Sequence, residues 1–128
     1  MVDRVHRVRL RSDFKRVRRS EQRVGGVLLR MRWAANGGSI TRFGFVVGRR
    51  VAARAHDRNR IRRRLQELAR RFLPLLPEGQ DIVFSALSGA MDASYWELGE
   101  AMQGLLTRAG LLARSPVPTV KGGDACGR

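Results

Sequence analysis

The chain has 128 residues, a length that suits one folded domain with a modest core. It carries 26 Lys and Arg against 11 Asp and Glu, for a net charge of +15. This excess of positive charge favours nucleic acid or an anionic membrane surface as partner. The apolar runs are too short for a membrane span and the first residues lack a secretory core, so we expect a cytoplasmic protein. A single cysteine, Cys126, excludes an internal disulfide and a cysteine zinc cluster.

The charge is distributed unevenly along the chain. Residues 42–71 hold eleven arginines against two acidic residues, whereas residues 72–107 hold five acidic residues and no Lys or Arg. Such polarity indicates that one side of the protein binds an anion and the other side does not.

The N-terminal part predicts an arm and a helix. Residues 1–11 are basic and suit a short extended arm, with His6 at the surface. Residues 12–19 predict a helix in which Phe14 and Val17 share one face and cations occupy the other.

Three segments predict strands. Residues 27–33 alternate, and one of their faces carries arginines, which suits a sheet surface that meets a polyanion. Residues 42–48 follow after a turn-forming cluster, so a hairpin with the first strand is the simplest pairing. Their nearly continuous apolar run predicts a central strand covered on both faces. Residues 81–87 predict a third strand.

The stretch from Arg49 to Phe72 predicts an arginine-rich helix. Helical spacing gives it one buried seam, formed by Ile61, Leu65, Leu68 and Phe72. His56 or Asp57 is the expected start, and Pro74 the expected end. Because only Asp57 and Glu67 oppose the arginines, the exposed face should need an external anion. Arginine suits phosphate, since its planar fork binds two oxygens at once.

A last helix is predicted from Asp92 or Ser94 to about Ala109, with Gly110 as its stop. Its apolar stripe consists of Tyr95, Leu98, Met102, Leu105 and Leu106, with Trp96 beside it. The elements together predict an α+β fold in which helices lie mostly on one face of a small mixed sheet. We expect one domain over residues 1–112 and a disordered basic tail over 113–128.

The sequence offers little for chemistry. It lacks metal-ligand spacing, a phosphate-cradling glycine loop and a nucleophile with a plausible base. His56 and Asp57 are adjacent and could form an acid–base pair, but neighbours on a helix point apart. The residues alone therefore favour an RNA- or DNA-binding module.

The block RAHDRNRIRRRLQEL resembles the signature of the protein subunit of bacterial ribonuclease P. The shared features are the Arg58-Asn59-Arg60 core in a basic helix and the paired cations Arg49-Arg50 after the strand RFGFVVG. The opening RLRSDFKRV and the closing helix extend the resemblance over about residues 8–112.

The resemblance implies a fold and a role. The fold is a ribosomal-protein-like two-layer sandwich in αβββαβα order. The role is to assist a catalytic RNA subunit in removing the 5′ leader of precursor tRNA by hydrolysis. The catalytic groups and the magnesium ions are expected with the RNA, so we expect no cofactor on the protein. No protein partner and no membrane are expected.

The resemblance also implies two sets of site residues. Contacts to the RNA subunit are expected from the basic segment: Arg49, Arg50, Arg54, Arg58, Asn59, Arg60, Arg62 and Arg63. A cleft between the first helix and the sheet is expected to hold the single-stranded leader. Phe14 matches an aromatic of that cleft, and Arg18 stands where the family often has a second one. Met31 lies near a further aromatic or histidine position, for which Trp33 could substitute.

Three alternatives remain at this point. The first is a basic RNA-binding protein without a role in cleavage, such as a ribosomal protein or an RNA chaperone. The second is a DNA-binding regulator that uses the arginine helix in a major groove. The third is a self-sufficient nuclease using His56 and Asp57.

Overall fold

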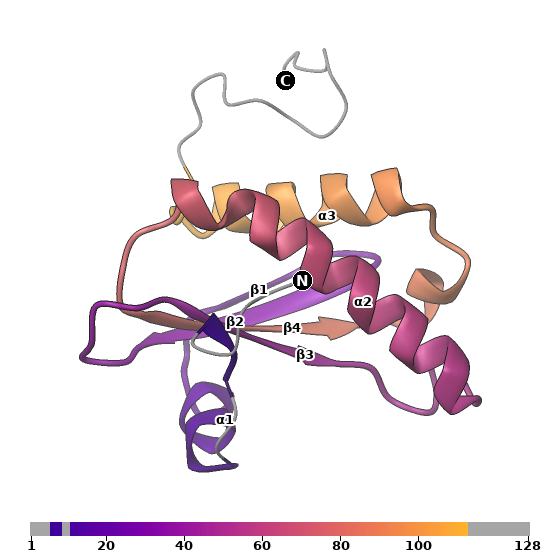
Figure 1. The fold of residues 1–128 in the computed structure, drawn as a ribbon, viewed down its shortest axis with the longest axis horizontal. Helices are drawn as coiled ribbons and strands as arrows, with labels where there is room; N and C mark the ends of the chain where they lie inside the picture. Colours follow the sequence, from indigo (N-terminus) through magenta and orange to yellow (C-terminus); the bar gives the residue numbers. More distant parts are fainter. Residues whose placement is uncertain (1–5, 9–10, 113–128) are drawn as a thin grey trace.

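The computed structural model describes residues 6–8 and 11–112, which form an α+β fold around a four-stranded sheet (Figure 1). Most of the predicted arm, the predicted tail and Cys126 lie outside the described residues. The helices and strands follow the αβββαβα order: α1 (Arg11–Arg18), β1 (Arg23–Gly25), β2 (Leu29–Ala35), β3 (Arg42–Val46), α2 (Ala55–Phe72), β4 (Gln80–Ala86) and α3 (Tyr95–Arg108). Two short 3₁₀ helices, η2 (Leu73–Leu75) and η3 (Ser88–Met91), flank β4.

The strand order in the sheet is β1-β2-β4-β3. Strand β2 runs antiparallel to both β1 and β4, and β3 runs parallel to β4. The predicted hairpin between β2 and β3 is therefore wrong, because β4 lies between these two strands. The predicted central position of β3 is also wrong. It is an outer strand, and on the edge away from β4 the Val8 N–H donates to the Phe43 carbonyl at 2.7 Å.

Helices cover both faces of the sheet. Helices α2 and α3 lie over one face and α1 lies against the other (Figure 1). Because side chains alternate along a strand, each strand serves both faces. On β2, Leu29, Met31 and Trp33 are buried in the core under α2 and α3, so Arg30 and Arg32 point to the α1 side.

The two long helices contribute the predicted apolar faces to the core. The α2 seam of Ile61, Leu65, Leu68 and Phe72 is buried, and the α3 stripe is buried from Leu98 onward. Burying a large apolar side chain completely contributes about 1.5–3 kcal/mol, so these faces hold both helices on the sheet.

The predicted helix ends are close to those observed. Helix α2 begins at Ala55, one residue before His56, and gives way to η2, which contains Pro74. Helix α3 begins with a capping box in which Ser94 Oγ accepts from Glu97 N–H and Glu97 Oε1 accepts from Ser94 N–H. Gly110 ends it with φ +80°. Within the described ranges, no helix is both long enough and apolar enough to cross a bilayer.

Candidate nucleic-acid interface

A cleft of about 670 Å³ lies between α1 and the sheet. Its wall on α1 is formed by Arg11, Phe14, Val17 and Arg18, and its floor by residues of β2, β3 and β4: Arg30, Met31, Arg32, Val46, Val83 and Ser85. The cleft therefore combines an apolar part with four arginines. A single nucleotide strand has the same two requirements, since its bases are apolar on their faces and its phosphates are anionic.

The structure moves the predicted cleft residue Trp33 away from the cleft and keeps Met31 in its floor. Trp33 is buried in the core under α2 and α3, and Met31 reaches the floor of the cleft with a fully buried side chain. The physical reason is the alternation of β2, which points every second residue away from α1. Arg30 and Arg32 occupy the cleft side instead. The arginine face of the predicted strand was the signal that could have found them.

Phe14 lies against Gly44 of β3. A Cβ atom built on Gly44 would lie 2.8 Å from Phe14 Cε1 and 2.9 Å from Phe14 Cζ. The ring thus occupies space that only a glycine leaves free. Phe14 is half-buried by this contact, and the remainder of the ring lines the cleft beside Val83.

The C-terminal end of α1 is tied to β2. Arg32 Nη1 donates to the Arg18 carbonyl, and Ser20 Oγ donates to the Trp33 carbonyl at 2.7 Å. A cation at a helix C-terminus is favourable for the helix dipole, so Arg32 stabilises α1 at this end. Arg18 itself is exposed at the rim of the cleft.

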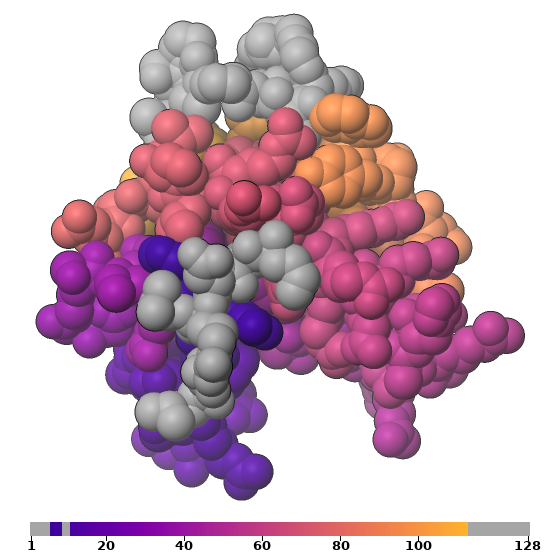
Figure 2. Space-filling model, viewed as in Figure 1, coloured from indigo at the N-terminus to yellow at the C-terminus, as the bar shows by residue number. Residues whose placement is uncertain are grey.

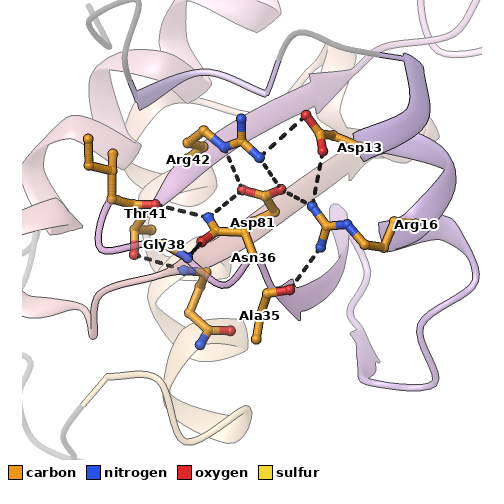
Figure 3. Close-up of polar contacts among 10 residues, drawn as sticks. Asp13, Arg16, Ala35, Asn36, Gly38, Thr41, Arg42 and Asp81 are labelled. Carbon is orange, nitrogen blue, oxygen red and sulfur yellow. Dashed lines mark hydrogen bonds and ion pairs between the residues drawn. The ribbon is translucent and has the colours of Figure 1, made fainter.

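Helix α1 is also tied to the sheet by an ionic cluster around Asp81 (Figure 3). Asp81 is fully buried and accepts from Arg42 Nε at 2.8 Å, Arg42 Nη2 at 2.7 Å and Asn36 Nδ2 at 2.9 Å. Arg16 of α1 also donates to Asp81, and Asp13 pairs with both arginines at 3.2 and 3.3 Å.

The hydrogen bonds of this cluster determine its ionisation. Burial works to raise the pKa of Asp81, but the bonds from Arg42, Asn36 and Arg16 outweigh burial and place that pKa below its ordinary value. Bonding to Asp81 correspondingly raises the pKa of Arg42. Asp81 is thus an anion held between two guanidinium groups, and the cluster fixes α1 relative to β3 and β4. Sequence reasoning missed it, because its members are far apart in the chain.

The second cationic surface consists of the beginning of α2 and the turn before it. Figure 2 shows this segment, in magenta, projecting from the body of the molecule. Six of the eight residues predicted to contact RNA are exposed here: Arg49, Arg50, Arg54, Asn59, Arg60 and Arg63. The other two, Arg58 and Arg62, are partly buried.

Few of these charges are neutralised within the described part of the chain. Arg60 forms an ion pair with Asp57 at a long 3.8 Å. Arg62 Nη1 donates to the neutral Asn59 Oδ1 at 2.6 Å, and Arg58 Nη1 donates to backbone carbonyls. The surface therefore keeps its positive charge for an external anion.

His56 is exposed, and Asp57 is oriented toward Arg60. Among the residues that the structure describes, no group of three His, Cys, Asp or Glu is placed to hold a metal ion.

Known proteins resemble this chain in sequence and in structure. A family model described as Ribonuclease P matches residues 2–110. The ribonuclease P protein component of Roseiflexus castenholzii is 37% identical over 112 residues, covering 87% of this chain and 91% of its own length. That of Xylella fastidiosa is 39% identical over 111 residues, covering 87% and 81%.

Solved structures agree with these sequence relatives. The RNase P protein of Thermotoga maritima has a TM-score of 0.72 at 28% identity, covering 80% of this chain and 96% of its own. The RNase P protein of Staphylococcus aureus has a TM-score of 0.77 at 20% identity, covering 84% and 97%, which is a likeness of fold.

Proposed function

Since this chain belongs to the ribonuclease P protein family and is thus a component of a tRNA-processing ribonuclease, we propose how it serves that enzyme. It binds the catalytic RNA subunit through the surface formed by α2 and the turn before it. It binds the 5′ leader of precursor tRNA in the cleft between α1 and the sheet. The RNA subunit performs the hydrolysis, in the cytoplasm.

The observation that carries the first part is the exposed positive charge on a rigid element. Arg60 and Arg63 project from a helix whose opposite side is anchored in the core by Ile61 and Leu65. Because their positions are set by the fold, little conformational entropy is lost when they meet phosphates. Contacts of this kind give affinity and register without selecting a base sequence.

The cleft supports the second part. Arg18 and Arg30 can pair with leader phosphates, while a base can stack on the free part of Phe14. Neither contact depends on the identity of the base. The cleft therefore suits an enzyme that must process precursors with many different leaders.

The protein contributes electrostatics rather than reacting groups. Two polyanions, the RNA subunit and the precursor, must approach closely, and the two cationic surfaces lower their mutual repulsion. Magnesium ions bound by the RNA would supply the charge at the scissile phosphate. This predicts that the protein is needed most when magnesium is scarce.

Reconstitution tests the proposal. Cleavage of precursor tRNA is measured at low magnesium with the RNA subunit alone, the protein alone and both together. We expect cleavage to rise strongly only when both are present. If adding the protein leaves the cleavage rate unchanged, the chain is a basic RNA-binding protein without a role in cleavage. Tighter binding to duplex DNA than to folded RNA at matched salt would favour a DNA-binding regulator instead.

A further inference from the structure

Arg58 differs from Arg60, the other arginine of the Arg58-Asn59-Arg60 core, in where its guanidinium lies. Its Nη1 turns back along the chain and donates to the carbonyls of Ala52 and Ala53, at 3.1 and 2.8 Å. The Arg58 side chain is partly buried, whereas Arg60 is exposed.

The two carbonyls belong to the turn that leads into α2. The N–H groups of Val51 and Ala52 both donate to the Gly48 carbonyl, at 3.1 and 3.3 Å. Arg49 and Arg50 lie at the corner of this turn and are exposed. Ala52 anchors its far end in the core, with 4% of its surface accessible. Arg58 thus ties the end of the turn to the first turn of α2.

The position of Arg58 is otherwise unfavourable for a cation. It lies near the N-terminus of α2, where the helix dipole favours negative charge. The residue at the N-cap, Arg54, makes no capping hydrogen bond with its side chain. Two carbonyl acceptors offset this cost, which gives an arginine at position 58 a structural reason independent of RNA.

We propose that Arg58 is a positioning residue for binding of the RNA subunit. It holds the turn over residues 48–54 so that Arg49 and Arg50 are presented to phosphates, and it does not itself supply the contact. The direct contacts come from Arg49 and Arg50 together with exposed cations of α2 such as Arg60. This inference rests on the proposed RNA-binding role of the surface.

A double-mutant cycle separates positioning from contact. Affinity for the RNA subunit is measured at one salt concentration for Arg58→Ala, for Arg49→Ala with Arg50→Ala, and for all three substitutions together. We expect Arg58→Ala to weaken binding about tenfold in the wild-type protein, but less than about twofold when Arg49 and Arg50 are already alanine, because coupled residues are non-additive. The same factor in both backgrounds would overturn the proposal.

Arg60→Ala is the matched control. It removes an exposed cation two residues from Arg58, and its effect should be the same factor in both backgrounds. Thermal unfolding of every variant shows whether the fold is retained.

Hydrogen exchange in the protein without RNA gives a second readout. We expect Arg58→Ala to speed exchange of the Val51 and Ala52 amides, and Arg60→Ala to leave both unchanged. Unchanged exchange in Arg58→Ala would overturn the inference while leaving the proposed function intact. If the wild-type protein fails to bind the RNA subunit at all, the proposed function fails first, and the role of Arg58 in RNA binding fails with it.

Discussion

Arg42 and Asp81 lie directly opposite each other on the parallel strands β3 and β4. The Arg42 guanidinium donates two hydrogen bonds of 2.8 and 2.7 Å to the Asp81 carboxylate. Asp81 is fully buried and also accepts hydrogen bonds from Arg16 of α1 and from Asn36 in the loop after β2. One carboxylate therefore joins two strands, a loop and the helix that forms one wall of the cleft.

Replacing this carboxylate should destabilise the protein. Asp81→Asn leaves Arg16 and Arg42 partly buried with Asp13 as their remaining anion, and breaking a buried pair costs about 3–5 kcal/mol. Urea unfolding measures the loss. Glu78→Gln is the matched control, because Glu78 is exposed in the loop before the same strand. Equal effects of the two substitutions would contradict a structural role of the cluster.

The same carboxylate predicts acid sensitivity. The pKa of Asp81 in the folded protein lies below the ordinary value of 3.8, so the unfolded chain takes up the proton first as the pH falls. The stability that Asp81 contributes is complete above the ordinary pKa and is lost as the pH falls through the folded pKa. Unfolding free energies between about pH 6 and about pH 2 should fall less steeply in Asp81→Asn than in the wild type. If the unfolding free energies of the two proteins fall in parallel with pH, other acidic residues are responsible for the acid sensitivity.

Gly44→Ala should disturb the cleft from its floor. The added methyl would lie 2.8 Å from the Phe14 ring and 3.3 Å from Val83 Cγ2, so the ring must shift toward the cleft. We expect overpacking to lower the free energy of unfolding by about 1–3 kcal/mol. We also expect the substitution to reduce the affinity for precursor tRNA more than the affinity for mature tRNA. Gly48→Ala is the control, since a Cβ there meets nothing within 4 Å. The placement of the leader would be contradicted if Gly48→Ala selectively reduced the affinity for precursor tRNA. It would also be contradicted if Gly44→Ala did not.

Arg30→Ala tests whether the sheet contacts the phosphates of the leader. Arg30 is exposed on the cleft side of β2, so its loss should weaken precursor binding and leave mature tRNA binding nearly unchanged. The slope of log affinity against log salt should flatten by about 0.7, the value for one contact to a single strand. Arg70→Ala, on α2 over the other face of the sheet, should leave the difference between precursor and mature tRNA unchanged. An unaltered slope in Arg30→Ala would remove Arg30 from the binding site.

Local periodicity predicted the helices well, because each is defined by its own residues. The seam of Ile61 and Leu65 on α2 and the stop at Gly110 needed no knowledge of the remaining chain. The pairing of strands is a non-local property. The simplest hairpin was wrong because β4, some forty residues later, inserts between β2 and β3. The residue pattern alone did not predict strand β1, since three residues carry no periodicity, whereas the αβββαβα order implied by the resemblance includes it.

The site was predicted unevenly for the same reason. Contiguous arginines identified the α2 surface, but no local pattern separates the inward-turned Arg58 from the exposed Arg60. The Asp81 cluster draws on residues from 13 to 81 and became visible only in the fold. For the cleft, Met31 lies in the floor as predicted, whereas Trp33 packs in the core under α2 and α3.

The alternation of β2 has a consequence for how this protein can change over time. Leu29, Met31 and Trp33 face one environment and Arg30 and Arg32 the other, so a point substitution in either set leaves the other set in place. Inserting or deleting one residue in the turn before β2 would exchange the two sets. Guanidinium groups would then point into the hydrophobic core and an indole ring into solvent. Lineages of this protein should therefore keep the length of that turn constant.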